Sequence, residues 1–250
     1  SVVHPASSAL VATTGTFNAG GTFGGAVLAG ASVNNFSPNQ LVTGENTDGQ
    51  AGLNIQTSAT GSGYVLFGDG AGAGAYMGQI RYSHSDDSIN FHTATVTRLS
   101  IDSSGNVTMP AQPAFSVHKN GTDQNNIGTG DVTVTWAAER FDVGSNFGAA
   151  GFTAPVTGKY QLQASIRFDN LDASHNYMMV VIKTSNENYR FIIDPDFGQD
   201  AAYFTISGSI LADMDASDTA IIFVTRDGGA SISDIDGDAE YTHFSGYLAC

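Results

Sequence analysis

Cysteine is almost absent from this sequence, where Cys250 is the only one. A lone thiol cannot cross-link the chain to itself, so stability must come from packing or from association between copies. Charged residues are also scarce, at 13%, and the polar surface must be built mostly from Ser, Thr, Asn, Gln and the backbone. No run of apolar residues is long enough to span a bilayer. We therefore expect no membrane insertion.

Basic residues are few, with 9 Lys and Arg against 24 Asp and Glu, for a formal net charge of −15. Binding to a phosphate backbone requires clustered Lys and Arg, so the composition argues against a nucleic-acid partner. It argues equally against docking on an anionic membrane surface. The acidity fits either plain solubility or cation binding, and the choice depends on whether carboxylates converge locally.

Helical periodicity and enzyme motifs are both missing. No window repeats apolar residues at the period of an amphipathic helix, whereas Thr and Val are abundant, which predicts an all-β protein. The sequence has no nucleophile elbow, no zinc-protease histidine pair and no phosphate-binding loop. It also lacks the long β-helical repeat on which paired carboxylates cleave polysaccharides in some phage spikes. We expect no enzyme.

Glycine is abundant instead, and more than half of the 30 glycines precede residue 110. Apolar residues come there in short bursts, such as 64–67 and 89–91, separated by turn signals such as Asp69-Gly70. A monomer with so few large apolar residues would bury too little surface to close a core. We predict that residues 1–110 form an intertwined trimeric β stalk rather than a flexible linker, because aromatic and β-branched residues return regularly.

Residues 111–250 are richer in long strand candidates. Alternating patterns at 132–136, 161–168 and 204–210 predict strands with one buried face. Continuous apolar runs at 177–182 and 220–224 predict strands that are covered on both faces. Several strands at this spacing are typical of a sandwich or jelly roll.

Three segments carry a first resemblance: 78–82 (GQIRY), 87–93 (DSINFHT) and 98–107 (RLSIDSSGNV). Their order and spacing resemble the distal stalk of bacteriophage tail fibres, over about residues 45–109. The turn signal Ser103-Ser104-Gly105-Asn106 predicts a hairpin between two alternating strands.

A second resemblance covers the other half. The segment 152–160 (FTAPVTGKY), with Ala114-Phe115-Ser116, Phe141-Asp142 and 244–248 (FSGYL), resembles the C1q/TNF-like globular domain. The resemblance implies a ten-stranded jelly-roll sandwich that forms compact trimers and serves recognition. Pro155 would then lie at a strand start, where its missing N–H costs no ladder hydrogen bond.

The sequence departs from that family at one turn. Relatives usually carry Gly-Asp before the penultimate strand, where this chain has Ser217-Asp218. Asp and Ser still favour a turn, so we expect the turn to be kept.

One acidic turn is a candidate metal site. Asp234, Asp236 and Asp238 alternate around Gly237, and alternate carboxylates can direct several oxygens to one point, as Ca²⁺ requires. The spacing is not that of an EF-hand, and a solvated turn is the competing interpretation. Resemblance to C1q-like domains, which often carry calcium near the trimer apex, favours Ca²⁺ somewhat.

Aromatic and histidine side chains suggest two further kinds of site. Trp136, Tyr177, Tyr189, Tyr203 and Tyr241 could form a sugar-binding platform, although core or subunit contacts explain most of them equally well. No two histidines pair at metal-ligand spacing, but one lying on a three-fold axis would occur three times. The six are His4, His84, His92, His118, His175 and His243.

These observations predict a virion tail-fibre receptor-binding protein, located extracellularly at the fibre tip. Its partners would be two further copies in a homotrimer, other virion tail proteins, and a bacterial surface glycan or protein. Three identical heads would add weak contacts into firm attachment. A structural head fibre or capsid decoration protein is the alternative, since it would need the same trimer and stalk.

Overall fold

The computed structural model describes residues 55–230 and 232–250. The part of the stalk prediction that falls on residues 1–54 lies outside the described residues. The described residues divide into two compact units, one of residues 55–96 with Ile101–Asn106 and the other of Thr97–Ser100 with the described residues from Val107 to Cys250. The predicted domain boundary at residue 110 stays a prediction.

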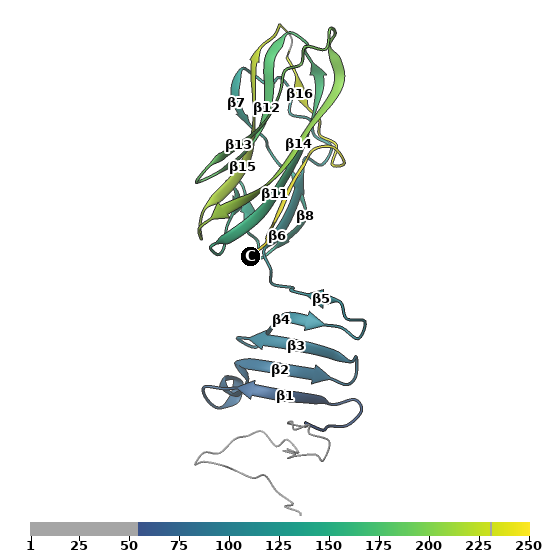
Figure 1. Cartoon of the computed structure of the whole chain (residues 1–250), viewed down its shortest axis with the longest axis vertical. Coiled ribbons are helices and arrows are strands. Elements are labelled where there is room, and N and C mark those ends of the chain that lie inside the picture. Colours follow the sequence, from purple (N-terminus) through teal and green to yellow (C-terminus); the bar gives the residue numbers. More distant parts are fainter. Residues whose placement is uncertain (1–54, 231) are drawn as a thin grey trace, which may run out of the picture. The chain divides into compact units, whose positions relative to one another are not determined.

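The first sheet, called here the stalk sheet, has its strands in chain order (Figure 1). They are β1 (Ser62–Phe67), β2 (Gly78–Ser83), β3 (Ser88–Thr93), β4 (Val96–Ile101) and β5 (Val107–Thr108), with a 3₁₀ turn η1 (Gly72–Tyr76) between β1 and β2. Antiparallel pairing sets Val65, Ile80 and Phe91 side by side on one face. Since side chains alternate, Tyr64, Arg81 and Asn90 form a more polar row on the other.

The turn predicted at 103–106 is present and is held by one carboxylate. Asp102 Oδ1 accepts hydrogen bonds from the backbone N–H groups of Ser104 and Asn106, both at 2.9 Å. Gly105 lies at a φ of 84°, a conformation that glycine adopts without strain. The hydrogen bond from the Asn106 side chain holds the pKa of Asp102 below its usual value.

Two further sheets pack face to face. The first has the order β14-β11-β17-β6-β8, with β16 paired to β11, and the second has the order β13-β12-β15-β10-β9, with β7 paired to β15. The first contains β6 (Ala114–His118), β8 (Ala138–Val143), β11 (Gly158–Leu171), β14 (Ala201–Met214), β16 (Asp234–Ile235) and β17 (His243–Leu248). The second contains β7 (Gly130–Thr133), β9 (Phe147–Gly148), β10 (Gly151–Thr153), β12 (His175–Thr184), β13 (Asn188–Ile193) and β15 (Thr219–Gly228).

From β10 onward the chain alternates between these sheets: β11, β14 and β17 lie in one, whereas β10, β12, β13 and β15 lie in the other. Wrapping of this kind defines a jelly roll. Ten strands form the two main paths and the short β7 and β16 add to them, which confirms the predicted ten-stranded jelly-roll sandwich.

The core of the sandwich is aromatic. Phe115 stacks on Phe152 with ring centroids 4.5 Å apart and meets Phe244 edge-on at 4.9 Å, while Tyr160 lies 5.4 Å from Phe152. All four side chains are fully buried. Four residues that carried the resemblance to the C1q/TNF-like domain are therefore the centre of the core.

The two continuous apolar runs are covered on both faces, as predicted. Consecutive residues 180–182 of β12 and 222–226 of β15 are buried. A strand with one solvated face would alternate instead. The alternating segment 161–168 lies in β11, where every second side chain from Tyr160 to Phe168 is fully buried.

Two expectations for local structure were wrong. Pro155 lies in the connection between β10 and β11 rather than at a strand start. The strand predicted at 132–136 is shorter than expected, because β7 ends at Thr133 and residues 134–136 lie outside it. Thr135 is bonded elsewhere: Gln124 Oε1 accepts from its N–H at 3.1 Å and from its hydroxyl at 3.2 Å, so a side chain replaces the ladder partner.

The turn at Ser217-Asp218 is kept, as expected. The N–H of Asp218 donates to the carbonyl of Asp215 at 3.0 Å, and Asp218 Oδ2 accepts from the N–H of Asp215 at 2.8 Å. Ser217 lies at a φ of 79°, in the left-handed region where the relatives' glycine would be unstrained.

Candidate functional site

The three carboxylates of the predicted metal site have separate partners. Asp234 Oδ1 accepts from the N–H of Asn126 at 2.7 Å. Asp236 Oδ1 accepts from the N–H of Asp238 at 2.7 Å, and Asp238 Oδ1 accepts from the N–H of Glu240 at 3.0 Å. Across residues 55–230 and 232–250, no three His, Cys, Asp or Glu side chains gather as a metal ion requires. The calcium site at these residues stays a prediction.

Asp236 instead takes part in an ion-pair network. Its Oδ2 lies 2.9 Å from Arg167 Nη2, and Arg167 Nε lies 3.2 Å from Asp169 Oδ1. Burial raises the pKa of Asp169, whereas its hydrogen bond to Arg167 acts in the opposite direction. The guanidinium supplies a counter-charge for Asp236, whereas Asp234 and Asp238 accept hydrogen bonds from backbone N–H groups.

Two of the candidate platform tyrosines flank the same arginine. The guanidinium carbon of Arg167 lies 4.3 Å from the ring centroids of both Tyr203 and Tyr241, within cation–π distance. Tyr203 keeps 66% of its surface exposed. Tyr177 and Tyr189 are half-buried on β12 and β13, and Tyr189 packs against the core. The five aromatics therefore do not form one platform.

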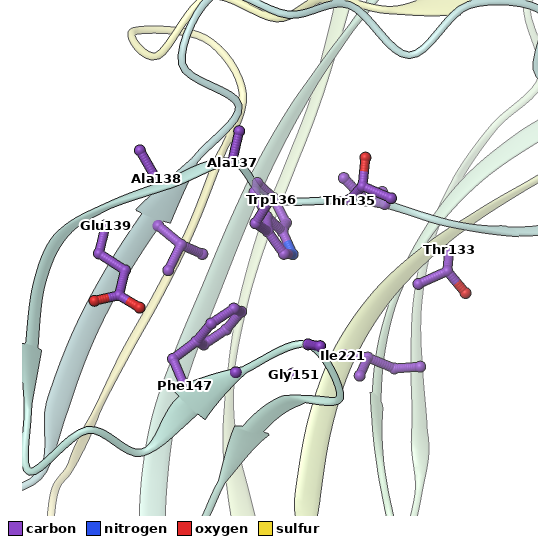
Figure 2. Close-up of a pocket in the computed structure, with 13 residues that line it drawn as sticks. Thr133, Thr135, Trp136, Ala137, Ala138, Glu139, Phe147, Gly151 and Ile221 are labelled. Carbon is purple, nitrogen blue, oxygen red and sulfur yellow. The ribbon is translucent and has the colours of Figure 1, made fainter.

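Trp136 lines a pocket of about 480 Å³ in the sandwich. One wall is the segment 133–139, from the last residue of β7 to the start of β8, and another is β9 with the turn that follows it. Figure 2 shows Trp136 and Phe147 on facing segments, with Glu139 to one side and Ile221 to the other.

The aromatic wall of the pocket is fixed by the core beneath it. The ring centroids of Trp136 and Phe147 lie 6.1 Å and 6.2 Å from that of buried Phe244. Val117 and Ile221 complete the apolar lining. Because these side chains rest on packed residues, the aromatic surface is formed before any ligand arrives.

Polar groups lie at the rim. Glu139 and Thr133 are exposed and line the pocket from β8 and β7. Lys119 is not part of the lining, and its Nζ donates to the carbonyl of Thr135 at 3.3 Å and to Gln124 Oε1 at 3.4 Å. Burial lowers the pKa of Lys119.

Two glycines lie in the pocket lining after Phe147. Gly151 has a φ of 96°, and a Cβ there would lie 2.5 Å from the carbonyl oxygen of Ala220, so no larger residue fits. Gly148 differs, because a Cβ added to it would meet nothing within 4 Å. Sequence reasoning named Trp136 but missed the pocket, since the strand predicted at 132–136 placed the ring in the core or a subunit contact.

The histidines do not assemble into a site in the described part of the chain. His243 and His118 are opposite each other on β17 and β6, and His118 Nδ1 accepts from the N–H of Asn120 at 3.0 Å. Burial, with the charge of Arg140, lowers the pKa of His243. Nδ1 of His243 is buried without a hydrogen-bond partner.

Comparison with known proteins finds likeness in solved structures only. No family model matches the chain, and no curated protein matches it. The globular domain of zebrafish complement 1qA protein is similar at 16% identity, covering 56% of this chain and 98% of that one, with a TM-score of 0.39. Murine APRIL (13% identity, 55% and 98%, TM-score 0.40) and Eiger TNF from S. frugiperda (15%, 56% and 94%, 0.37) are also similar.

The jelly-roll architecture rests on the strand order of the two sheets. At such identities and TM-scores the similar structures assign no function. No helix in the described residues has the length and apolarity needed to cross a membrane.

Proposed function

We propose that the chain is a homotrimeric adhesin of a virion tail fibre, in which the jelly-roll sandwich binds a receptor on a bacterial surface. The proposal rests on the resemblance of residues 45–109 to fibre stalks and on a binding-type fold with a preformed pocket. The structural observation that supports trimerisation is the exposed apolar face of the stalk sheet.

The apolar face of the stalk sheet has no cover among the described residues. Phe67 keeps 59% of its surface exposed, and Val65, Ile80, Tyr82 and Phe91 on the same face are also exposed. An antiparallel sheet normally buries its apolar face against a core, and an uncovered apolar patch marks an interaction surface.

Further copies of the same chain are the partner that this face fits best. The row from Val65 through Ile80 to Phe91 carries no charge, so identical faces meet without repulsion. Three such faces turned toward one axis would give the sheet the core that a single copy lacks, as the low apolar content of residues 1–110 already required.

The oligomeric state tests this first. Size-exclusion chromatography with multi-angle light scattering on the full chain should give three times the chain mass of 25.9 kDa. A monomer at micromolar concentration would overturn the trimer and the stalk with it.

Attachment is tested separately. Fluorescently labelled protein should bind whole cells of a susceptible bacterium and compete with virions for adsorption. Binding should survive EDTA if no cation takes part, and loss on chelation would support Ca²⁺ at Asp234, Asp236 and Asp238. A trimer that binds purified capsids but no cells would favour the alternative, a head fibre or capsid decoration protein.

A further inference from the structure

We infer that the pocket between Trp136 and Phe147 binds one residue of a neutral saccharide. This deepens the proposed function, since it names the receptor class and the surface that meets it. The pocket itself, however, is argued from its own lining and tested without cells.

The size and walls of the pocket suit a sugar ring. About 480 Å³ falls in the range of small-ligand sites. The rings of Trp136 and Phe147 supply the apolar surface against which the C–H face of a pyranose packs, and an indole offers the largest such surface of any side chain. Since both rings rest on Phe244, little ordering is needed on binding.

The polar rim suits hydroxyl groups. The carboxylate of Glu139 makes no hydrogen bond or ion pair within the described part of the chain and lies exposed at the rim, where it can accept hydrogen bonds from sugar hydroxyls. The hydroxyl of Thr133 can donate as well as accept. A polyol presents both donors and acceptors, so this pair complements it.

Charge selects against acidic sugars. The lining contains Glu139 but no Lys or Arg among the described residues, and the whole chain carries a formal charge of −15. An anionic ligand would approach a negative protein and meet a carboxylate without a counter-charge. A neutral sugar carries no such penalty.

Trp136 provides a direct readout, because it is the only tryptophan in the chain. We would titrate the full-length protein with the methyl glycosides of glucose, galactose and N-acetylglucosamine into the high millimolar range, following indole fluorescence. At least one glycoside should give a saturable change, with a dissociation constant around 1 mM. N-acetylneuraminic acid should give none.

Variants test the place of binding. Phe147→Ala should abolish the fluorescence response, because it removes one of the two rings against which the sugar packs while Trp136 stays as the reporter. Glu139→Gln should weaken binding about tenfold, the usual loss when one charged hydrogen-bond partner is neutralised. Glu240→Gln makes the same chemical change at an exposed residue outside the pocket lining and should leave the titration unaltered.

The failures of the two proposals are distinguishable. If no glycoside shifts the fluorescence, and saturation-transfer NMR also detects no contact, the saccharide inference is overturned even where the protein still binds cells. A saturable response to choline chloride alone would overturn it in favour of a cationic ligand. If glycosides bind and Phe147→Ala blocks them, but cells are not bound, the pocket proposal is supported and the adhesin proposal fails.

Discussion

At the scale of single residues, Ser217 has a strained backbone conformation. Its φ of 79° is costly for any side chain with a Cβ, and the family it resembles uses glycine there. Ser217→Gly should relieve about 1 kcal/mol of strain, partly offset by the greater freedom of glycine in the unfolded chain. We expect a melting temperature raised by about 2 °C in calorimetry.

A matched control for that change is Ser209→Gly, since Ser209 lies within β14 at an ordinary strand conformation. There the added backbone freedom has no strain to relieve, so the melting temperature should fall. If both variants fall together, the turn at Ser217 is unstrained.

His243 gives a second prediction at this scale. Burial and Arg140 lower its folded-state pKa below the usual 6.5, so the folded protein resists protonation more than the unfolded chain does. The contribution of His243 to the free energy of unfolding is therefore fully present above the pKa of the unfolded chain. It is lost as the pH falls toward the lower pKa of the folded protein. His243→Gln should flatten the decline of melting temperature between about pH 7 and pH 5. Equal slopes for both proteins would contradict this.

At the scale of elements, the two faces of β3 predict opposite outcomes for the same charge. Phe91→Asp places a carboxylate on the apolar face of the stalk sheet, which trimerisation would bury without a partner. Asn90→Asp places it on the opposite face, across from Arg81. Light scattering should show Phe91→Asp shifted to smaller species and Asn90→Asp still trimeric. Two trimeric variants would place the interface elsewhere.

Much of the secondary structure could be predicted from alternation alone, because side-chain burial on a strand follows its period. Alternation does not distinguish Tyr160 and Phe244 from other buried positions, whereas the family motif includes both, and they lie at the centre of the core. The position of Trp136 could not be predicted, since the backbone N–H of Thr135 donates to the side chain of Gln124 instead of to a neighbouring strand. Gln124 is 11 positions away in the sequence. A contact of that kind has no periodic signal.

The partner of a charged residue in the acidic turn also could not be predicted from the sequence. Alternation at Asp234, Asp236 and Asp238 suggested converging oxygens, but Asp236 pairs with Arg167, nearly 70 residues earlier in the chain. Only the fold shows that this guanidinium is near. Charge spacing along the sequence predicts a cluster of carboxylates, whereas the counter-charge of Asp236 comes from another strand.

At the scale of the whole molecule, attachment should depend on copy number more than on any one pocket. If single sites bind at about millimolar strength, three on one fibre raise the effective affinity by two or more orders of magnitude. Phe91→Asp should therefore lose cell binding while its fluorescence titration stays normal. Surface plasmon resonance on immobilised cell envelopes would measure the difference as a faster off-rate, and unchanged off-rates would show that binding is monovalent.

The strand order also determines when each sheet can form during translation. Strands β1 to β3 pair with neighbours in the chain, so each hairpin can close soon after it leaves the ribosome. In the sandwich, β6 pairs with β8 on one side, but its other side has no partner until β17, which lies between β6 and β11, has been translated. The sheet that contains β6 and β11 is therefore completed only when β17 has been made, so the sandwich exposes apolar surface longer than the stalk sheet does and is the part of the nascent chain more in need of chaperone protection.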